Sequence, residues 1–288
     1  MDVIPQKLDF AIGIKQTGGE YQDELALIVL IPEKLPRDQV PADQLIPAEF
    51  EGFRTDVVQF RPTEIADTSP HDPLLGGIQI SRPAFVDDDG NLRSKAGTLG
   101  AMARNRSDGA MLMLTNCHVL PDAGVDVHQP ADLITGHRVV GTSDRGVSTN
   151  DWLDCAVAVV GEGQAVSAAI ADIGPVAGTT DVTLWQQVTK RGAQTGVTSG
   201  LVVSVIPDLS EGMIIGMIID TFPFGSLFCW HGDSGSVILN LSGEVVGLLF
   251  AMDDEQCDPA GTPLRARGLA STIGPVLDAL QIDIEVSP

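Results

Sequence analysis

The chain has 288 residues, with 17 Lys and Arg against 39 Asp and Glu, so its formal net charge at pH 7 is -22. A surface of that sign repels nucleic-acid phosphates, and we expect no nucleic-acid partner. Hydrophobic residues make up 43% of the sequence, which is enough for a packed core and too many for an acidic disordered chain. The 31 Gly and 18 Pro indicate short strands joined by tight turns.

The amino-terminal residues MDVIPQKLDF lack the basic stretch and the apolar run of a secretory signal. No apolar stretch approaches the roughly 18 residues that span a bilayer. We therefore expect a cytoplasmic protein without a membrane partner, and the sequence leaves a homo-oligomer open. The cysteines are widely spaced and show no CxxC pattern, so free thiols are favoured over a disulfide framework. They are Cys117, Cys155, Cys229 and Cys257.

Residues 1–66 predict a small α/β module at the start of the chain. Residues 8–15, 24–31 and 55–60 have the apolar content of strands, and residues 41–50 favour a short helix or turn. The proline-rich stretch that follows, RPTEIADTSPHDP, indicates a connector, because Pro removes backbone donors and restricts its predecessor. We place this linker at residues 67–79.

Residues 80–288 predict a mainly β domain. Short apolar runs alternate with clusters of Gly, Asp, Asn and Ser, which is typical of an antiparallel barrel or sandwich. Helical spacing is confined to the tail STIGPVLDALQ, where four apolar residues fall on one face. These residues are Ile273, Val276, Leu277 and Leu280.

Ser234 is the candidate nucleophile. It lies in the stretch WHGDSGS, directly before an apolar strand, and Gly232 and Gly235 flank the Asp-Ser pair. Two such glycines permit a tight turn that holds backbone N–H groups toward one point and presents the Ser hydroxyl. A Ser hydroxyl is a weak nucleophile and requires an adjacent base. His118, at the end of the apolar run AMLMLTN, is the candidate base.

Asp154 is the candidate partner of that histidine. It opens the apolar strand CAVAVV, and a carboxylate in such a position needs a polar partner to offset the free-energy cost of burial. The imidazole N–H of His118 would supply one. Asp144 and Asp151 are nearby alternatives, but both lie among polar residues and are interpreted as solvated turn residues.

The ordered motifs TNCHVL, DCAVAVV and GDSGS resemble those of the trypsin/chymotrypsin family of serine peptidases. TKRGAQTGVTSG, residues 189–200, is similar to a Gly-Thr-Gly segment of the bacterial members. The resemblance covers about residues 80–288 and implies two antiparallel six-stranded barrels with the active site between them. It also implies that Ser234 attacks a peptide carbonyl while His118 transfers the proton and Asp154 holds the imidazole tautomer.

The resemblance further implies residues that support the nucleophile. The oxyanion donors would be the backbone N–H groups of Gly232 and Ser234. Asp233 must be neutralised, and Lys190 or Arg191 would do this from the Gly-Thr-Gly segment. One departure from the family pattern is Ser236, which stands where a second Gly is usual and would narrow the turn.

The substrate pocket implied by the resemblance lacks an acidic residue. Phe228 stands six residues before the Ser, where trypsin-like members that bind Lys or Arg carry an acid. Together with Phe250 and Met252, it indicates an apolar or shallow pocket. Secreted relatives join two loops near Cys229 and Cys257 by a disulfide, but without a secretion signal we expect both thiols to be reduced.

The favoured hypothesis is a serine endopeptidase that makes limited cuts in a specific protein partner, with a protein or peptide substrate and no cofactor. The alternatives are a catalytically silent scaffold that binds proteins and a non-peptidase acyl hydrolase. We predict no metal site, because His128 and His137 are nine residues apart and no acidic or Cys companion is recognised at ligand spacing. The acidic run Asp87–Asp89 predicts a hairpin turn rather than a calcium loop, because the remaining ligands are missing.

Overall fold

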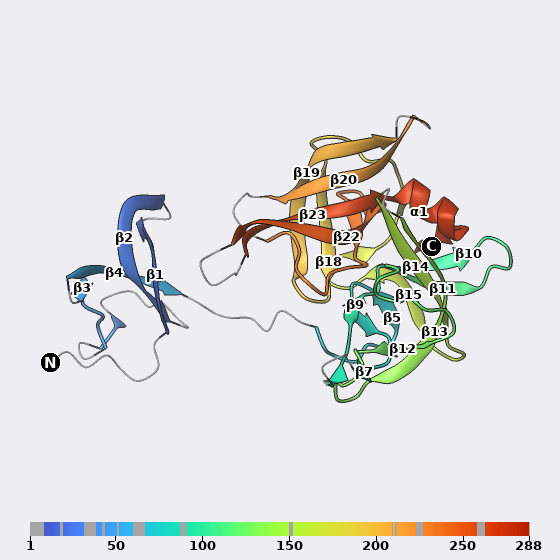
Figure 1. Cartoon of the computed structure of the whole chain (residues 1–288), viewed down its shortest axis with the longest axis horizontal. Helices are drawn as coiled ribbons and strands as arrows, with labels where there is room; N and C mark the ends of the chain where they lie inside the picture. Colours follow the sequence, from blue (N-terminus) through green and yellow to red (C-terminus); the bar gives the residue numbers. More distant parts are fainter. Residues whose placement is uncertain are drawn as a thin grey trace. The chain divides into compact units, whose positions relative to one another are not determined.

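The computed structural model describes residues 9–17, 20–31, 39–41, 44–50, 52–59, 67–86, 90, 92–149, 152–208, 210, 212–222, 227–257 and 263–287. The chain divides into two compact units, residues 1–64 and 65–288 (Figure 1). Within the described part, no helix is long and apolar enough to cross a membrane. The predicted turn at Asp87–Asp89 and the alternative Asp151 lie outside the described residues.

The first unit is built on a mixed four-stranded sheet in the order β1-β2-β4-β3. The first pair of strands is antiparallel, whereas β2 and β4 run parallel. No α-helix occurs among the described residues of this unit, so the α part of the predicted α/β module is not confirmed. The strands are β1 (Asp9–Thr17), β2 (Glu20–Ile31), β3 (Glu49–Phe50) and β4 (Phe53–Gln59).

Residues 67–79, which the sequence predicts as a linker, contain a strand of the second unit. This strand, β5 (Leu74–Gly76), pairs in parallel with β15 (Val166–Ile170). Leu74 and Ile78 are fully buried. These two side chains are therefore part of the core rather than of an exposed connector.

The first half of the second unit is an eight-stranded sheet that curves into a half-barrel, in the order β24-β10-β11-β14-β13-β12-β6-β9. Two small sheets accompany it, one of β7 with β8 and one of β16, β15 and β5. The remaining strands are β6 (Gln79–Ser81), β7 (Phe85–Val86), β8 (Leu92–Arg93), β9 (Ala96–Thr98), β10 (Ala101–Asn105), β11 (Met111–Thr115), β12 (Asp126–Gln129), β13 (Arg138–Thr149), β14 (Leu153–Val160), β16 (Gly174–Pro175) and β24 (Ile282–Ile284).

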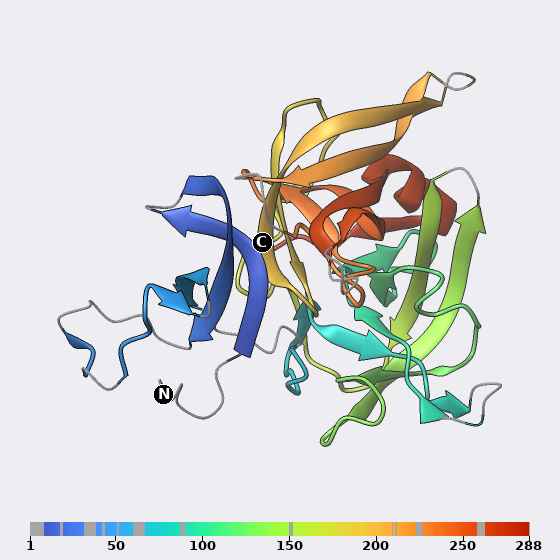
Figure 2. The ribbon, with the colours of Figure 1, turned by 60° about the vertical axis from the view of Figure 1, so that its left-hand side comes forward.

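The second half is a barrel that the pairing of β22 with β23 closes around six strands, β18 to β23 (Figure 2). Of the two six-stranded barrels that were predicted, the described pairings thus form one closed barrel and one half-barrel. The strands of this sheet are β17 (Gly178–Thr179), β18 (Gln187–Gly192), β19 (Gly196–Asp208), β20 (Met213–Thr221), β21 (Val237–Asn240), β22 (Glu244–Cys257) and β23 (Pro263–Thr272).

The helix α1 (Ile273–Leu280) connects the cores of the two halves. Its buried face is the predicted one, made by Ile273, Val276, Leu277 and Leu280. These residues belong to one apolar cluster together with side chains of both sheets, among them Leu112, Val157, Val237 and Leu248. The two halves therefore share part of their core, which fixes the elements of one half against those of the other.

Candidate active site

Strand register brings His118 and Asp154 together. β11 pairs with β14 so that Thr115 lies opposite Ala156, which places the residues just after β11 beside the start of β14. Nδ1 of His118 lies 2.6 Å from Oδ2 of Asp154. The other carboxylate oxygen accepts hydrogen bonds from the backbone N–H groups of Cys117, at 2.7 Å, and of His118, at 3.2 Å.

These contacts fix the protonation pattern of the imidazole. An ionised carboxylate only accepts hydrogen bonds, so in a neutral imidazole the Nδ1 of His118 carries the proton and donates it to Asp154. Nε2 is then left with a free lone pair. The Asp154 side chain is 15% exposed and that of His118 is 46% exposed, so the carboxylate is sheltered while the imidazole reaches solvent.

Ser234 lies in the tight turn that the glycines predict. Gly232 and Gly235 have φ angles of 102° and 96°, in the region that L side chains rarely adopt. Among the hydrogen bonds of the described residues, none is donated by the backbone N–H of Gly232 or Ser234. Both amides are thus available to a ligand.

Thr98, at the end of β9, holds this turn from the other half of the unit. Its amide donates to the carbonyl of Ser234 at 2.8 Å, and its hydroxyl donates to the carbonyl of Gly232 at 2.9 Å. The same hydroxyl accepts a hydrogen bond from the amide of Ala193 at 3.0 Å. One threonine therefore joins the half-barrel to two loops of the closed barrel.

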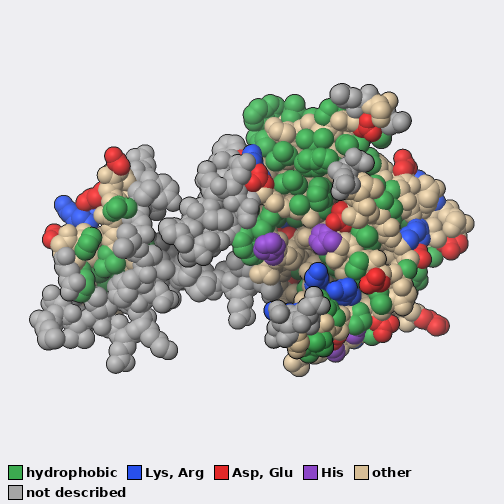
Figure 3. Space-filling view, viewed as in Figure 1, with side chains coloured by type: hydrophobic (Ala, Val, Ile, Leu, Met, Phe, Trp, Pro, Cys, Tyr) green, Lys and Arg blue, Asp and Glu red, His purple; other side chains and the backbone are tan. Residues whose placement is uncertain are grey.

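His118 and Ser234 line the same two pockets, together with His231. One pocket, of about 310 Å³, is bounded mainly by apolar residues, and the other is of about 420 Å³. Histidine and hydrophobic side chains lie side by side on the face of the second unit shown in Figure 3. Both residues therefore border one cavity, and among the described hydrogen bonds none joins His118 to Ser234.

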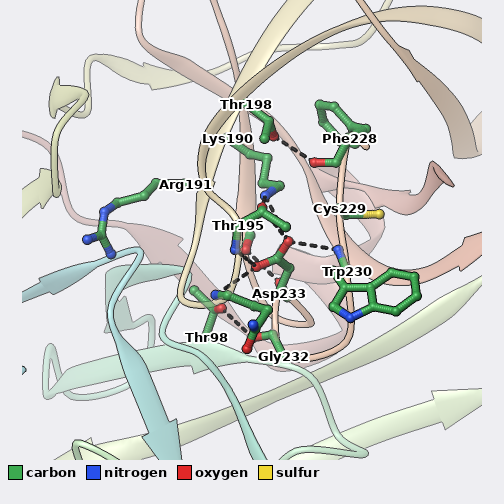
Figure 4. A network of polar contacts seen from close by, with 12 residues as sticks. Thr98, Lys190, Arg191, Thr195, Thr198, Phe228, Cys229, Trp230, Gly232 and Asp233 are labelled. Carbon is green, nitrogen blue, oxygen red and sulfur yellow. Dashed lines mark hydrogen bonds and ion pairs between the residues drawn. The ribbon is translucent and has the colours of Figure 1, made fainter. Parts of the chain in front are cut away.

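Asp233 is fully buried next to the nucleophile and accepts several hydrogen bonds (Figure 4). Lys190 donates to its Oδ2 from 2.9 Å, and the same oxygen accepts from the hydroxyl of Thr195 at 2.6 Å and the amide of Trp230 at 2.9 Å. Oδ1 accepts from the amides of Gln194 and Thr195, both at 3.0 Å. The buried charge is thus compensated on both oxygens.

Of the two predicted partners, the structure places Lys190 against Asp233 and directs Arg191 elsewhere (Figure 4). Lys190 is completely buried, and burial lowers its pKa while the ion pair with Asp233 opposes this effect. Arg191 donates to Asp67 at 2.6 Å, to Asp172 at 2.8 Å and to the carbonyl of Gly77 at 2.5 Å.

Ser236 fits the turn in place of the usual glycine. It is fully buried, and its hydroxyl donates to the backbone carbonyl of Asp233 at 2.6 Å. The turn therefore accommodates the serine through a hydrogen bond to its own backbone.

Cys229, which precedes the turn, is a free thiol, and burial raises its pKa to about 12. The side chain of Cys257 lies outside the described residues.

Two of the three residues predicted to line the substrate pocket lie at the apolar pocket. Phe250 and Met252 line it, together with Trp230 and Leu249. Phe228 does not, because its side chain is fully buried in the core of the closed barrel. None of the described residues around this pocket is acidic.

Comparison with known proteins identifies the family to which this chain belongs. Residues 100–248 match the family of trypsin-like peptidase domains. The chain belongs to this family. No curated protein sequence matches the chain.

Solved structures with the same fold cover about three quarters of the chain. A Nocardiopsis protease has a TM-score of 0.53 at 16% identity, with 75% of this chain and 100% of that chain covered. A chymotrypsin of Cellulomonas bogoriensis gives 0.50 and 18%, with the same coverage. A protease described as glutamic acid specific, with a histidine triad in substrate binding, gives 0.53 and 16%, with 74% and 100% covered. At these identities the likeness is one of fold.

Several residues of the site were not predicted from the sequence. Thr195 lies inside the quoted Gly-Thr-Gly segment, so a signal for it was present. Thr98 and Asp67 carry no motif, and only the three-dimensional contacts identify them. Each of these side chains orients the turn or its supporting loop rather than facing the pockets.

Gly192 offers a test of the packing around Asp233. A Cβ at this position would overlap the Asp233 carboxylate. We expect Gly192→Ala to lower the free energy of unfolding by about 1–3 kcal/mol in a urea titration, because the buried charge must shift. The matched control is Gly274→Ala in α1, where a Cβ meets nothing within 4 Å. It should leave stability unchanged or raise it by up to about 1 kcal/mol, since Ala favours helix over Gly. Equal stability of both variants would contradict the packing argument.

Asp67 predicts a pH dependence of stability. Burial alone would raise the pKa of Asp67, but hydrogen bonds from Arg191, the amide of Ser69 and His71 lower it from 3.8 to about 2. Because the pKa is lower in the folded state, the ionised Asp67 stabilises the fold by about 2 kcal/mol at pH values above its pKa in the unfolded chain. This contribution is lost as the pH falls toward 2.

We expect wild type to exceed Asp67→Asn in unfolding free energy at pH 6, and the difference to shrink between pH 4 and pH 2. Urea titrations across this range measure it. Asp181→Asn, at an exposed carboxylate, is the control and should follow wild type at every pH. A difference between wild type and Asp67→Asn that stays constant with pH would show that the ion pair is not its source.

Proposed function

We propose that the chain is a serine endopeptidase that hydrolyses peptide bonds through His118, Asp154 and Ser234. The observation that carries this proposal is an imidazole whose Nδ1 contacts a sheltered carboxylate at 2.6 Å and which lines the same pocket as a serine between two glycines. Membership of the trypsin-like peptidase family supports the reaction class. A protein or peptide is the substrate class that follows.

The proposed reaction proceeds in two acyl-transfer steps. His118, protonated on Nδ1, accepts the hydroxyl proton of Ser234 on Nε2 as the serine oxygen attacks the carbonyl carbon. The same proton passes to the leaving amine, and an acyl-enzyme forms. Water then attacks the ester with His118 again as base, which releases the second product and restores the serine.

Two unpaired amides would stabilise the charge that develops on the carbonyl oxygen. We assign this role to the backbone N–H groups of Gly232 and Ser234, because neither donates to another described group. The hydrogen bonds of Thr98 to the carbonyls of the same two residues support their orientation. Asp233 and Lys190 act as positioning residues, since both are fully buried and neither lines the pockets.

We further propose that the cleavage is limited to a specific protein partner and that the first unit serves in its selection. Residues 1–64 form a separate compact unit with its own sheet, while the closed barrel and the half-barrel both lie in residues 65–288. A separate module is suited to docking or regulation rather than to the chemistry itself. A silent protein-binding scaffold is the competing function, and active-site labelling separates it from a peptidase.

The proposal predicts a specific pattern of activity loss. Ser234→Ala and His118→Ala should each lower kcat by about 10⁴-fold or more, because each removes a proton-transfer or nucleophilic step. Asp154→Asn should lower it by about 10⁴-fold through the wrong tautomer. Asp144→Asn is the control, since Asp144 pairs with Arg145 and lines neither pocket.

These variants are measured with a protein substrate and with a fluorophosphonate that labels an activated serine. Labelling of wild type that disappears in Ser234→Ala, with unchanged circular dichroism, supports a peptidase. Absence of both labelling and cleavage in wild type would favour the scaffold. Ester turnover without any cut in protein substrates would favour an acyl hydrolase. A larger effect of Asp144→Asn than of Asp154→Asn would refute the assignment of the carboxylate.

The lining of the smaller pocket predicts the residue that precedes the cleaved bond. Leu249, Phe250 and Met252 offer apolar surface in a volume of about 310 Å³, and the described lining contains no carboxylate for a basic side chain. We expect kcat/KM for Leu, Met or Phe at this position to exceed that for Lys or Arg by at least about 100-fold, measured with a peptide library. Among the described lining residues, His231 is the one apart from His118 that could favour Glu, and a preference for Glu over Leu would overturn the apolar assignment.

A further inference from the structure

Three side chains with metal-binding atoms meet where β12 is connected to β13. His128, Asp132 and His137 each offer one ligand atom, and these atoms all lie within 4.8 Å of one another. None of the three lines the pockets of the candidate active site. The spacing of the two histidines along the chain predicted no role for the aspartate between them.

Asp132 is held in place by the neighbouring backbone. Its Oδ2 accepts a hydrogen bond from the amide of Ala84 at 2.7 Å, and its Oδ1 accepts one from its neighbour Leu133 at 3.1 Å. Its own amide donates to the hydroxyl of Ser81 on β6 at 2.8 Å. A carboxylate is ionised at neutral pH. An oriented anion of this kind is a suitable ligand for a divalent cation.

His128 contributes a buried nitrogen without a partner. Its Nδ1 is inaccessible to solvent, and no hydrogen-bond partner for it occurs in the described part of the chain. Buried polar atoms are nearly always paired, and an exception requires an explanation such as an ion. The ring of His128 lies 5.2 Å from the ring of His137, centroid to centroid. The unpaired nitrogen therefore belongs to an imidazole that lies beside a second potential ligand.

His137 closes the group on its solvent side. Its Nδ1 lies 2.7 Å from Oδ1 of Asp132, and its side chain is 39% exposed. Ligand atoms around tetrahedral zinc are about 3.4 Å apart, given bonds of about 2.1 Å. The separation of 2.7 Å between these two atoms and the limit of 4.8 Å for the whole group lie on either side of this value, so we expect binding to require only small side-chain movements. The exposure of His137 leaves room for a water ligand.

We propose that His128, Asp132 and His137 bind a Zn²⁺ ion, with water as the fourth ligand. Two imidazoles and one carboxylate suit zinc, whereas Ca²⁺ and Mg²⁺ prefer sites built from oxygen alone. The ion would tie β12 to the start of β13 and, through Asp132, to the segment that follows β6. Binding that requires the folded connection stabilises the half-barrel, because the unfolded chain does not hold the three ligands together.

The test uses the full chain carrying His118→Ala, because His118 and His231 share a pocket and would add a second histidine pair for zinc. Calorimetric titration with ZnCl₂ should give one ion per chain, and Co²⁺ should give the intense visible bands of a four-coordinate site. Adding His137→Gln or Asp132→Asn should weaken zinc binding by about 100-fold or more. Zn²⁺ should raise Tm in the parent and not in these two variants.

The matched control is His71→Gln. His71 also pairs with an aspartate, Asp67, at 2.8 Å, but belongs to no such three-residue group among the described residues. It should bind zinc as the parent does. Because His137 is partly exposed, His137→Gln should have the same Tm as the parent in EDTA. If Asp132→Asn does not fold, the zinc binding of His137→Gln alone decides the test.

Four outcomes would overturn the proposal. Zinc binding that is absent in the parent, or equally strong in His137→Gln, would leave His137 and Asp132 as a pair in contact without a role in binding a metal. An equal loss in His71→Gln would show that the effect is not local. A rise in Tm with Ca²⁺ as large as that with Zn²⁺ would rule out a site selected by imidazole ligands.

Discussion

The candidate active site depends on a carboxylate that is buried beside the proposed nucleophile. Asp233 is fully buried, as is its partner Lys190. Removing two charges from water costs several kcal/mol each, and the attraction between them offsets this only where their remaining hydrogen-bonding groups are satisfied. Here the β18–β19 hairpin supplies the ammonium, a hydroxyl and two backbone amides to the carboxylate. The turn that carries Ser234 is therefore held by the ion pair and hydrogen bonds of Asp233, which have few alternative geometries.

The second constraint is that the reacting groups come from different halves of one unit. His118 and Asp154 are placed by the pairing of β11 with β14, whereas Ser234 is placed by the turn before β21. Their relative position is kept by a shared apolar cluster that includes α1, and by Thr98 reaching across to the turn. Rigid elements on both sides position a site more accurately than free loops do. This explains how side chains from two sheets reach one pocket.

Most of the site could be predicted from the sequence because its residues lie in local motifs, and the buried face of α1 followed from apolar spacing alone. The features that could not be predicted depend on the direction in which a side chain points and on distances between residues that are brought together only by the fold. Lys190 and Arg191 are adjacent on β18, and neighbouring strand residues point to opposite faces, so the sequence could not decide which one meets Asp233. Asp132 was overlooked because no spacing rule links a loop aspartate to His128, although the fold brings them together.

The alternation of faces along β18 has one more structural consequence. Lys190 points to Asp233, and Arg191, on the opposite face, binds Asp67 near the start of the second unit. The amide of Asp67 also donates to the carbonyl of Ala193 at 2.7 Å, one residue before the amides that hold Asp233. The end of β18 and the residue after it thus bind Asp67, at the start of this unit, and the same end of the strand supports the buried carboxylate of Asp233. Because both contacts involve the same short segment, the charge of Asp67 stabilises the loop on which the geometry of the Ser234 turn depends.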